Sequence, residues 1–267
     1  MKTDLSISKK DLERIENFRL IDDDFMTKVF DGRLEETELV LKIILGIPDL
    51  SVLSVVAQKE IKNLQGRSAR FDIHAVDSKK KLYDIEIQRA DKGAGAKRAR
   101  YNSSIIDANT ILAGEQHEQL PETYVIFITE NDVLAHDLRV YHIERIVQET
   151  GELFDDKAHT VYVNAAYSNE ENEIGRLMHD FRETDPKKMH NAILADRVGY
   201  FKNDPEGRSI MCKAMEDMRN DAVLEEQKNR IAMKLRKGKD PKEIHEDDEY
   251  PMELILSVQK ELLAEVQ

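Results

Sequence analysis

The spacing of apolar residues along the chain predicts mixed helices and strands up to about residue 165 and helices alone after it. Apolar residues at helical spacing predict a helix over Leu34–Leu45, which Gly46 and Pro48 end. A second helix is predicted from about Ala94 to Leu112. The six predicted strands are Val52–Ile61, Ser68–Asp77, Leu82–Gln88, Tyr124–Thr129, Val140–Ile143 and Thr160–Asn164.

This pattern divides the chain into three parts. Residues 1–20 look helical, polar and loosely attached, and residues 21–180 carry the predicted α/β domain. Residues 181–267 form a predicted C-terminal helical region, interrupted at Pro186, Pro205, Gly238 and Pro251. The boundary between the last two parts is expected between residues 165 and 185.

The second and third predicted strands alternate apolar and polar residues, and this alternation sets their pairing. With a three-residue turn over Ser78–Lys80, Val76 opposes Leu82. A shift of this register by one residue would mix apolar and polar positions on both faces. In the unshifted register, the apolar face holds the pairs Phe71–Ile87, Ile73–Ile85 and Ala75–Tyr83. The polar face of the same register holds Asp72–Glu86, Arg70–Gln88 and His74–Asp84.

The predicted pairing places the carboxylates of Asp72 and Glu86 against each other. Facing carboxylates repel, and a divalent cation between them removes that cost. Such hard oxygen ligands suit Mg²⁺ or Mn²⁺. The structural alternative is a solvated polar sheet face on which Arg70 neutralises a carboxylate.

Composition and charge narrow the function classes. The 267 residues have a formal net charge of −13, which argues against a protein that coats nucleic acid by bulk attraction. A local basic patch stays compatible with that charge, and residues 89–100 hold five basic residues and one acidic one. Residues 228–242 hold seven basic residues and one acidic, for which a solvated helix face is the simpler interpretation.

The compartment is inferred from features that the chain lacks. No apolar run approaches the roughly 20 residues that cross a bilayer, and the N-terminus is too charged for a secretory signal. The single cysteine, Cys212, excludes an internal disulfide framework and a cysteine-rich zinc site. We therefore expect a cytoplasmic protein with no membrane association.

The order of these motifs resembles the PD-(D/E)XK nuclease superfamily. In that superfamily an aspartate precedes an E-x-K strand, as Asp72 precedes Glu86-Ile87-Gln88 here. The glutamine variant is similar to the Rpn family of recombination-promoting nucleases, over roughly residues 20–200. Further segments that match this family are Asp22–Phe30 (DDDFMTKVF), Arg98–Tyr101 (RARY) and Leu120–Thr129 (LPETYVIFIT).

The resemblance implies a fold, a reaction and a site. The implied fold is a restriction-endonuclease-like α/β fold, in which helices flank a mixed central sheet. The implied metal ligands are Asp72, Glu86 and the backbone carbonyl of Ile87, and Gln88 stands where the superfamily has lysine. Glutamine positions a water molecule but cannot deprotonate it, so the metal, Mg²⁺ or Mn²⁺, would have to lower the pKa of the water.

Three further residues complete the predicted site. Such sites often take an acid from a preceding helix, and Glu38 is our choice over Glu35, although an ordinary surface role fits it as well. Arg98 and Tyr101 lie one helical turn apart and suit phosphate contacts; helix surface and core packing are their alternatives. For His74 we expect a supporting polar role rather than metal binding.

The sequence as a whole predicts a metal-dependent DNA endonuclease, linked to recombination or a mobile element. "Transposase" would be a family label, because no residue indicates strand transfer. One alternative is a weak or inactive descendant that only binds DNA or protein, and another is a nuclease that acts on RNA. A homodimer is compatible with the sequence.

Overall fold

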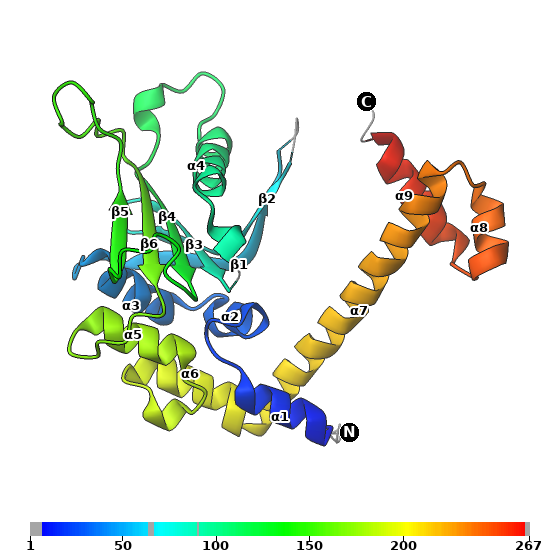
Figure 1. Cartoon of the computed structure of the whole chain (residues 1–267), viewed down its shortest axis with the longest axis horizontal. Coiled ribbons are helices and arrows are strands. Elements are labelled where there is room, and N and C mark those ends of the chain that lie inside the picture. The colour runs from blue at the N-terminus through cyan, green and yellow to red at the C-terminus, as the bar shows by residue number, and fades with distance from the viewer. Residues whose placement is uncertain (1–6, 64–66, 90, 265–267) are drawn as a thin grey trace. The chain divides into compact units, whose positions relative to one another are not determined.

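The computed structural model describes residues 7–63, 67–89 and 91–264. The chain divides into two compact units, Met1–Met211 and Cys212–Gln267. The first unit contains a six-stranded sheet with helices on both faces (Figure 1). The second unit is helical. The predicted α/β fold class, with a mixed sheet and a C-terminal helical region, is therefore confirmed.

The sheet is mixed because some neighbouring strands are joined antiparallel by hairpins, whereas others lie parallel. Its strand order is β1-β2-β3-β4-β6-β5. Strands β1, β2 and β3 pair antiparallel, β4 lies parallel to both β3 and β6, and β5 closes the far edge antiparallel to β6. All bounds lie within two residues of those that the apolar pattern predicts. They are β1 (Val52–Ile61), β2 (Ala69–Asp77), β3 (Leu82–Gln88), β4 (Thr123–Thr129), β5 (Val140–Ile143) and β6 (Ala158–Asn164).

The helices form two layers around this sheet. Helix α4 (Ala96–Thr110) covers one face, and α2 (Asp23–Phe30), α3 (Leu34–Leu45) and α5 (Glu173–Arg182) cover the other (Figure 1). Helix α3 has the predicted bounds, and Gly46 ends it with a φ of +65° that favours glycine. Short 3₁₀ helices are η1 (Asp91–Ala94), η2 (His117–Gln119) and η3 (Pro186–Lys188).

The N-terminal segment is anchored, which corrects the prediction of a loosely attached lead. Helix α1 (Lys9–Asn17) buries Ile15, and Leu20 is buried just after it. The ammonium group of Lys202 donates to the carbonyls of Glu16 and Phe18. The apolar side of α1 therefore packs within the first unit. Residues 1–6 lie outside the described residues.

Helix α6 (Ala192–Asn203) also belongs to the first unit. The predicted boundary places this helix in the C-terminal region, but α6 packs against α1 and α3 and buries Leu194, Val198 and Phe201. A helical apolar pattern shows that a face is buried without showing its partner. The first unit therefore extends to Met211, beyond the predicted boundary.

The second unit has a small core of its own. Helix α7 (Pro205–Arg236) runs into it, followed by α8 (Pro241–Asp248) and α9 (Met252–Ala264). Ile231, Ile244, Ile255 and Val258 form the core between these helices. Within the described residues, no helix combines the length and apolar character that a membrane span requires.

Candidate active site

The predicted pairing of β2 with β3 is present at four positions. They are Val76–Leu82, Ala75–Tyr83, His74–Asp84 and Ile73–Ile85. The pairing between these two described strands ends there, one step before Asp72 and Glu86. Beyond that point Oδ2 of Asp72 accepts a hydrogen bond of 2.8 Å from the backbone N–H of Ile87. A carboxylate therefore replaces a backbone carbonyl in the ladder.

The face of β2 changes between Ile73 and Phe71, which corrects part of the predicted hairpin. The predicted register places Phe71 opposite Ile87, on the face of Ile73. In the structure Phe71 packs in the core beneath α4 with Phe127, and its ring stacks on His74 with centroids 6.1 Å apart. Strict alternation along β2 therefore fails at Asp72, the position that the prediction assigned to metal binding.

An irregularity in β1 accompanies this change of face. Gln58 has a φ of +52°, which is unusual for a residue other than glycine. The β1–β2 pairs on either side are Ala57–Ile73 and Lys59–Phe71, so Gln58 and Asp72 lie unpaired between them. This irregularity lies directly beside Asp72, whose carboxylate contacts β3.

Two further carboxylates lie beneath α4 on β3. Asp84 and Glu86 are both fully buried, and the predicted alternation that places them on one face is observed. The amide of Asn102 on α4 donates to both, over 2.9 Å to Asp84 Oδ2 and 3.1 Å to Glu86 Oε1. Oδ1 of Asp84 is buried without a hydrogen-bond partner in the described structure.

The electrostatics of this carboxylate cluster (Asp72, Asp84 and Glu86) favour added positive charge. Burial raises the pKa of Asp72 to about 6. Burial, and next the charge of Asp72, raise the pKa of Glu86 to about 7. Burial and the charge of Glu86 raise the pKa of Asp84 well above its usual value.

Arg98 is the cation that the fold supplies to this cluster. Its guanidinium group pairs with the Glu86 carboxylate, donates to the carbonyl of Gly93 over 3.1 Å, and lies 5.8 Å from the centroid of the Phe127 ring. One arginine offsets one of three carboxylates. The hard oxygen donors, and the Asp84 oxygen that has no hydrogen-bond partner among the described residues, fit a divalent cation, which would also lower the raised pKa values of these carboxyl groups.

Gln88 lies at the open edge of the cluster. Its amide donates to Glu86 Oε2 over 3.4 Å. Gly93 packs against this amide, because a Cβ atom at Gly93 would lie 2.0 Å from Gln88 Oε1. No sequence pattern points to Gly93, because its role depends on the return of η1 to the end of β3.

The acid that a helix brings toward the cluster is Asp23 rather than the predicted Glu38. The Gln58 amide donates to Asp23 Oδ1 over 3.2 Å, to Thr27 Oγ1 over 3.2 Å and to Asp72 Oδ1 over 3.4 Å. Burial, and then the charge of Asp24, raise the pKa of Asp23. Asp23 lies in the family-like segment already noted, and the aspartate-rich start of that segment was its only sequence signal.

Glu38 performs a different task in the structure. Its carboxylate accepts from Lys42 over 2.7 Å and from the backbone N–H of Val52 over 2.9 Å. Val52 pairs with Asp77, five residues along β2 from Asp72 and hence roughly 17 Å away. The structure therefore does not bring Glu38 to the cluster; Glu38 fixes the start of β1 against α3.

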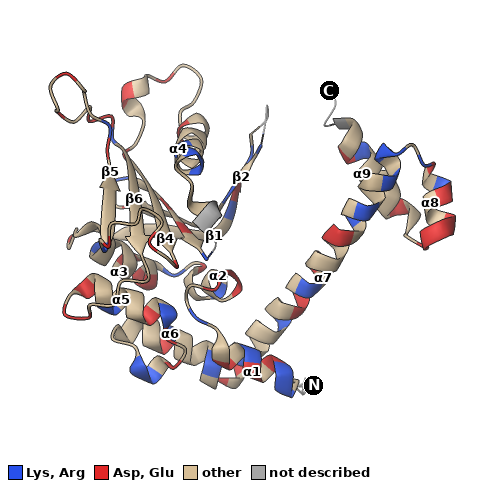
Figure 2. Cartoon of the chain, in the orientation of Figure 1, with Lys and Arg blue, Asp and Glu red and all other residues tan. Residues whose placement is uncertain are grey.

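A groove of about 910 Å³ that is lined by basic residues adjoins the cluster. Figure 2 shows the Lys and Arg positions along β2 and α4. Arg98 and Asn102, which contact the carboxylates, lie in its wall. The basic side chains of the wall come from β2, from the residues just before it and from α4. The full lining is Asn63, Arg67, Ser68, Ala69, Arg70, Gly93, Lys97, Arg98, Tyr101 and Asn102, with no acidic residue among them.

Tyr101 joins the two sides of this groove. Its hydroxyl donates to the carbonyl of Arg67 and accepts from the Asn63 amide over 3.2 Å. The predicted pair of Arg98 and Tyr101 is therefore in the groove wall. In the structure both residues already have protein partners.

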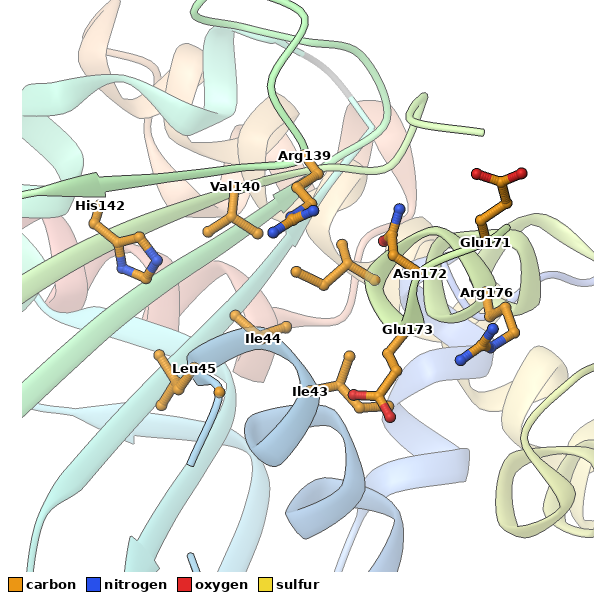
Figure 3. Close-up of a pocket in the computed structure, with 12 residues that line it drawn as sticks. Ile43, Ile44, Leu45, Arg139, Val140, His142, Glu171, Asn172, Glu173 and Arg176 are labelled. Atoms are coloured by element: carbon orange, nitrogen blue, oxygen red, sulfur yellow. The ribbon is translucent and has the colours of Figure 1, made fainter. Parts of the chain in front are cut away.

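Two other features do not join this site. A pocket of about 570 Å³ opens between α3, β5 and α5, lined by Ile43, Val140 and Arg176 among others (Figure 3). It lies across the sheet from α4 and away from the carboxylate cluster.

The basic stretch 228–242 does not join this site either. In it, Lys228, Arg230, Lys234 and Lys239 each pair with a carboxylate.

A comparison with known families finds a match to the part of the chain that carries this site. A family model described as PD-(D/E)XK nuclease family transposase matches residues 42–183, more than half of the 267 residues. The matched segment contains the whole sheet and α4, and with them Asp72, Glu86 and Gln88. No curated protein and no solved structure matches the chain.

Proposed function

The chain belongs to the PD-(D/E)XK nuclease family transposases, and on this basis we propose that it is a metal-dependent endonuclease that hydrolyses phosphodiester bonds in DNA. The observation that carries the proposal is the buried carboxylate cluster beside a groove with four basic side chains. Carboxylates hold a cation, and arginine and lysine hold a phosphate backbone. A link to recombination or a mobile element is part of the proposal.

Asp72, Glu86 and the backbone carbonyl of Ile87 would hold the ion, Mg²⁺ or Mn²⁺. Asp72 already contacts the Ile87 N–H, which keeps these groups together. When bound, such an ion lowers the pKa of a water nucleophile and offsets the charge that develops on the phosphate. Asp84 would support this group, since one of its oxygens has no partner among the described residues.

The other side chains would orient the reactants. Asn102 holds Asp84 and Glu86 in place, while the Gln88 amide would position a water by hydrogen bonds. The basic groove residues, Arg67, Arg70 and Lys97, would hold the DNA backbone without reading its sequence.

A plasmid-nicking assay of the full chain tests the proposal. We expect conversion of supercoiled DNA to nicked and linear forms with Mg²⁺ or Mn²⁺, and none with EDTA. Cleavage that persists in EDTA would contradict a metal-dependent reaction. An RNA substrate in parallel separates a ribonuclease from the proposed activity on DNA.

The alternative function is a nuclease-fold module that only binds DNA or protein. Two observations favour it: Arg98 already pairs with Glu86, and Gln88 replaces the superfamily lysine. This alternative predicts salt-sensitive DNA binding in the absence of divalent ions and no cleavage of DNA or RNA with any of them. Assays of binding and cleavage on the same preparation distinguish the two functions.

A further inference from the structure

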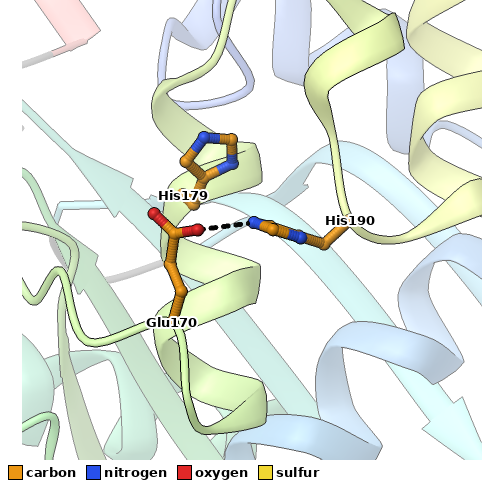
Figure 4. A group of neighbouring side chains, drawn as sticks. All are labelled: Glu170, His179 and His190. Carbon is orange, nitrogen blue, oxygen red and sulfur yellow. Dashed lines mark hydrogen bonds and ion pairs between the residues drawn. The ribbon is translucent and has the colours of Figure 1, made fainter.

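A second group of potential metal ligands lies on the other side of the sheet from α4. It consists of Glu170, His179 and His190 (Figure 4). Each offers one ligand atom, and the three atoms lie within 4.8 Å of one another. Among the described residues, this is the one group of His, Cys, Asp or Glu side chains whose ligand atoms lie that close together. The carboxylate cluster at Glu86 does not meet this distance condition.

The three residues come from separate segments that the fold brings together. Glu170 lies between β6 and α5, His179 is on α5, and His190 lies between η3 and α6. Oε2 of Glu170 is 2.8 Å from Nε2 of His190, and the two imidazole rings pack edge to face with centroids 4.7 Å apart. All three side chains are partly exposed, so an ion and a water molecule have access.

A buried carboxylate contacts both histidines and holds them in place. Asp180 is fully buried and accepts from the backbone N–H groups of His190 over 2.7 Å and Asn191 over 2.8 Å. Its Oδ1 also lies 3.3 Å from Nδ1 of His179. Carboxylates that support histidine in this way are a regular feature of protein metal sites.

The position of Glu170 is also fixed. Gly175 packs so closely on the loop that a Cβ atom there would lie 1.8 Å from the carbonyl oxygen of Asn169. Arg176 donates to the carbonyl of Glu170 over 3.2 Å. The loop before α5 therefore holds Glu170 beside the histidines with little freedom to move.

We propose that Glu170, His179 and His190 bind one transition-metal ion of the Zn²⁺ type, with water as a further ligand. Two imidazoles and one carboxylate are a ligand set that Zn²⁺ takes, whereas Mg²⁺ prefers oxygen ligands alone. The bound ion would take the place of the hydrogen bond between Nε2 of His190 and Oε2 of Glu170. It joins three chain segments and stabilises the first unit. This site is independent of the proposed nuclease site.

Metal binding by the full chain tests this inference. The protein is stripped with a chelator, dialysed and titrated with Zn²⁺, with bound metal measured by mass spectrometry and stability by thermal melting. We expect one bound Zn²⁺ that an excess of Mg²⁺ does not displace, and a higher Tm. Absence of Zn²⁺ binding above the buffer background would overturn the inference.

Variants locate the site. His190→Asn and Glu170→Gln should each weaken Zn²⁺ binding at least about tenfold and abolish the rise in Tm. His117→Asn, at an exposed histidine on η2, is the matched control and should bind as the parent does. Unchanged Zn²⁺ affinity in both His190→Asn and Glu170→Gln, with the parent fold retained, would place the ion elsewhere.

Discussion

The carboxylate of Asp72 accepts a hydrogen bond of 2.8 Å from the backbone N–H of Ile87, the residue that follows Glu86. This bond lies just beyond the last pair of the β2–β3 ladder. The position of the Asp72 carboxylate therefore depends on the backbone of the two strands at that point. It also fixes Asp72 close to Glu86, which raises the pKa of Glu86 in addition to the effect of burial. The site thus concentrates negative charge that a cation would neutralise.

Removal of the Glu86 charge should abolish cleavage and stabilise the metal-free fold. Glu86→Gln keeps the size of the side chain and an acceptor for Asn102 and Arg98. Because the folded pKa of about 7 exceeds the ordinary 4.5, the ionised group destabilises the fold above pH 7. In EDTA at pH 8 the variant should gain up to about 3 kcal/mol in free energy of unfolding.

The pH dependence of that gain is its control. Glu86 takes up a proton in the folded parent as the pH falls from about 7 toward 4.5, so most of the gain should disappear at pH 5. Denaturant unfolding at both pH values measures it. Full nicking activity in the Glu86→Gln protein would instead place the chemistry at other residues.

Gln88 provides a test of how the water is positioned. Gln88→Ala should lower the single-turnover rate about 10- to 100-fold, and Gln88→Lys should preserve or raise it. Gly93→Ala should act like Gln88→Ala, because its methyl group displaces the Gln88 amide from Glu86. Rates are normalised to the folded fraction from thermal melting. If Gln88→Ala cleaves as fast as the parent, the amide has no part in the reaction.

Asp23 and Glu38 give opposite expectations as the helical acid. Asp23→Asn should weaken Mn²⁺ binding and lower the cleavage rate, since Asp23 shares Gln58 with Asp72. Glu38→Gln should cleave normally and lose about 1 kcal/mol of stability with its bonds to Lys42 and Val52. Isothermal titration with Mn²⁺ and denaturant unfolding measure the two effects. The reverse outcome would restore Glu38 to the site.

The groove should supply the salt-dependent part of DNA binding. Arg70→Glu and Arg67→Glu should each weaken binding and reduce the slope of log affinity against log salt by about one or more. Lys79→Glu changes the charge equally at the opposite end of β2 and serves as the control. Fluorescence anisotropy on a short duplex at several salt concentrations measures the slopes. Equal losses in all three variants would indicate net charge rather than a groove.

His74 should make the protein sensitive to mild acid. Burial and next the charge of Lys59 lower the pKa of His74 to about 4, from 6.5. The unfolded chain therefore binds a proton that the folded chain excludes, and His74 costs stability as the pH falls from 6.5 to 4, by about 3 kcal/mol in full. Asp72 and Glu86 act in the opposite direction in the absence of metal, because their pKa values are raised.

A comparison with His74→Gln isolates this effect. The difference in free energy of unfolding between variant and parent should shift in favour of the variant as the pH falls from 7.5 to 4.5. Denaturant unfolding across that range, in EDTA, provides the measurement. A constant difference would show that His74 titrates equally in the folded and unfolded protein.

The sequence by itself determined the strands, their register near the turn and the shared face of Asp84 and Glu86. These features are local, because residues two apart in a strand point to one side and an apolar face tolerates no one-residue shift. The same alternation failed at Phe71. An irregularity in the neighbouring strand β1, at Gln58, accompanies the change of face. No residue pattern within β2 indicates this change.

Tertiary structure decided which distant groups reach the carboxylates and which do not. Helix α4 brings Asn102 and Arg98 onto Glu86, and α2 brings Asp23 toward Asp72 while Glu38 on α3 stays at the start of β1. It also decided the meeting of His179 with His190, which the sequence places on separate segments. Helical periodicity specifies which side of a helix is buried, but the contact between two elements depends on how connections and core packing set their positions.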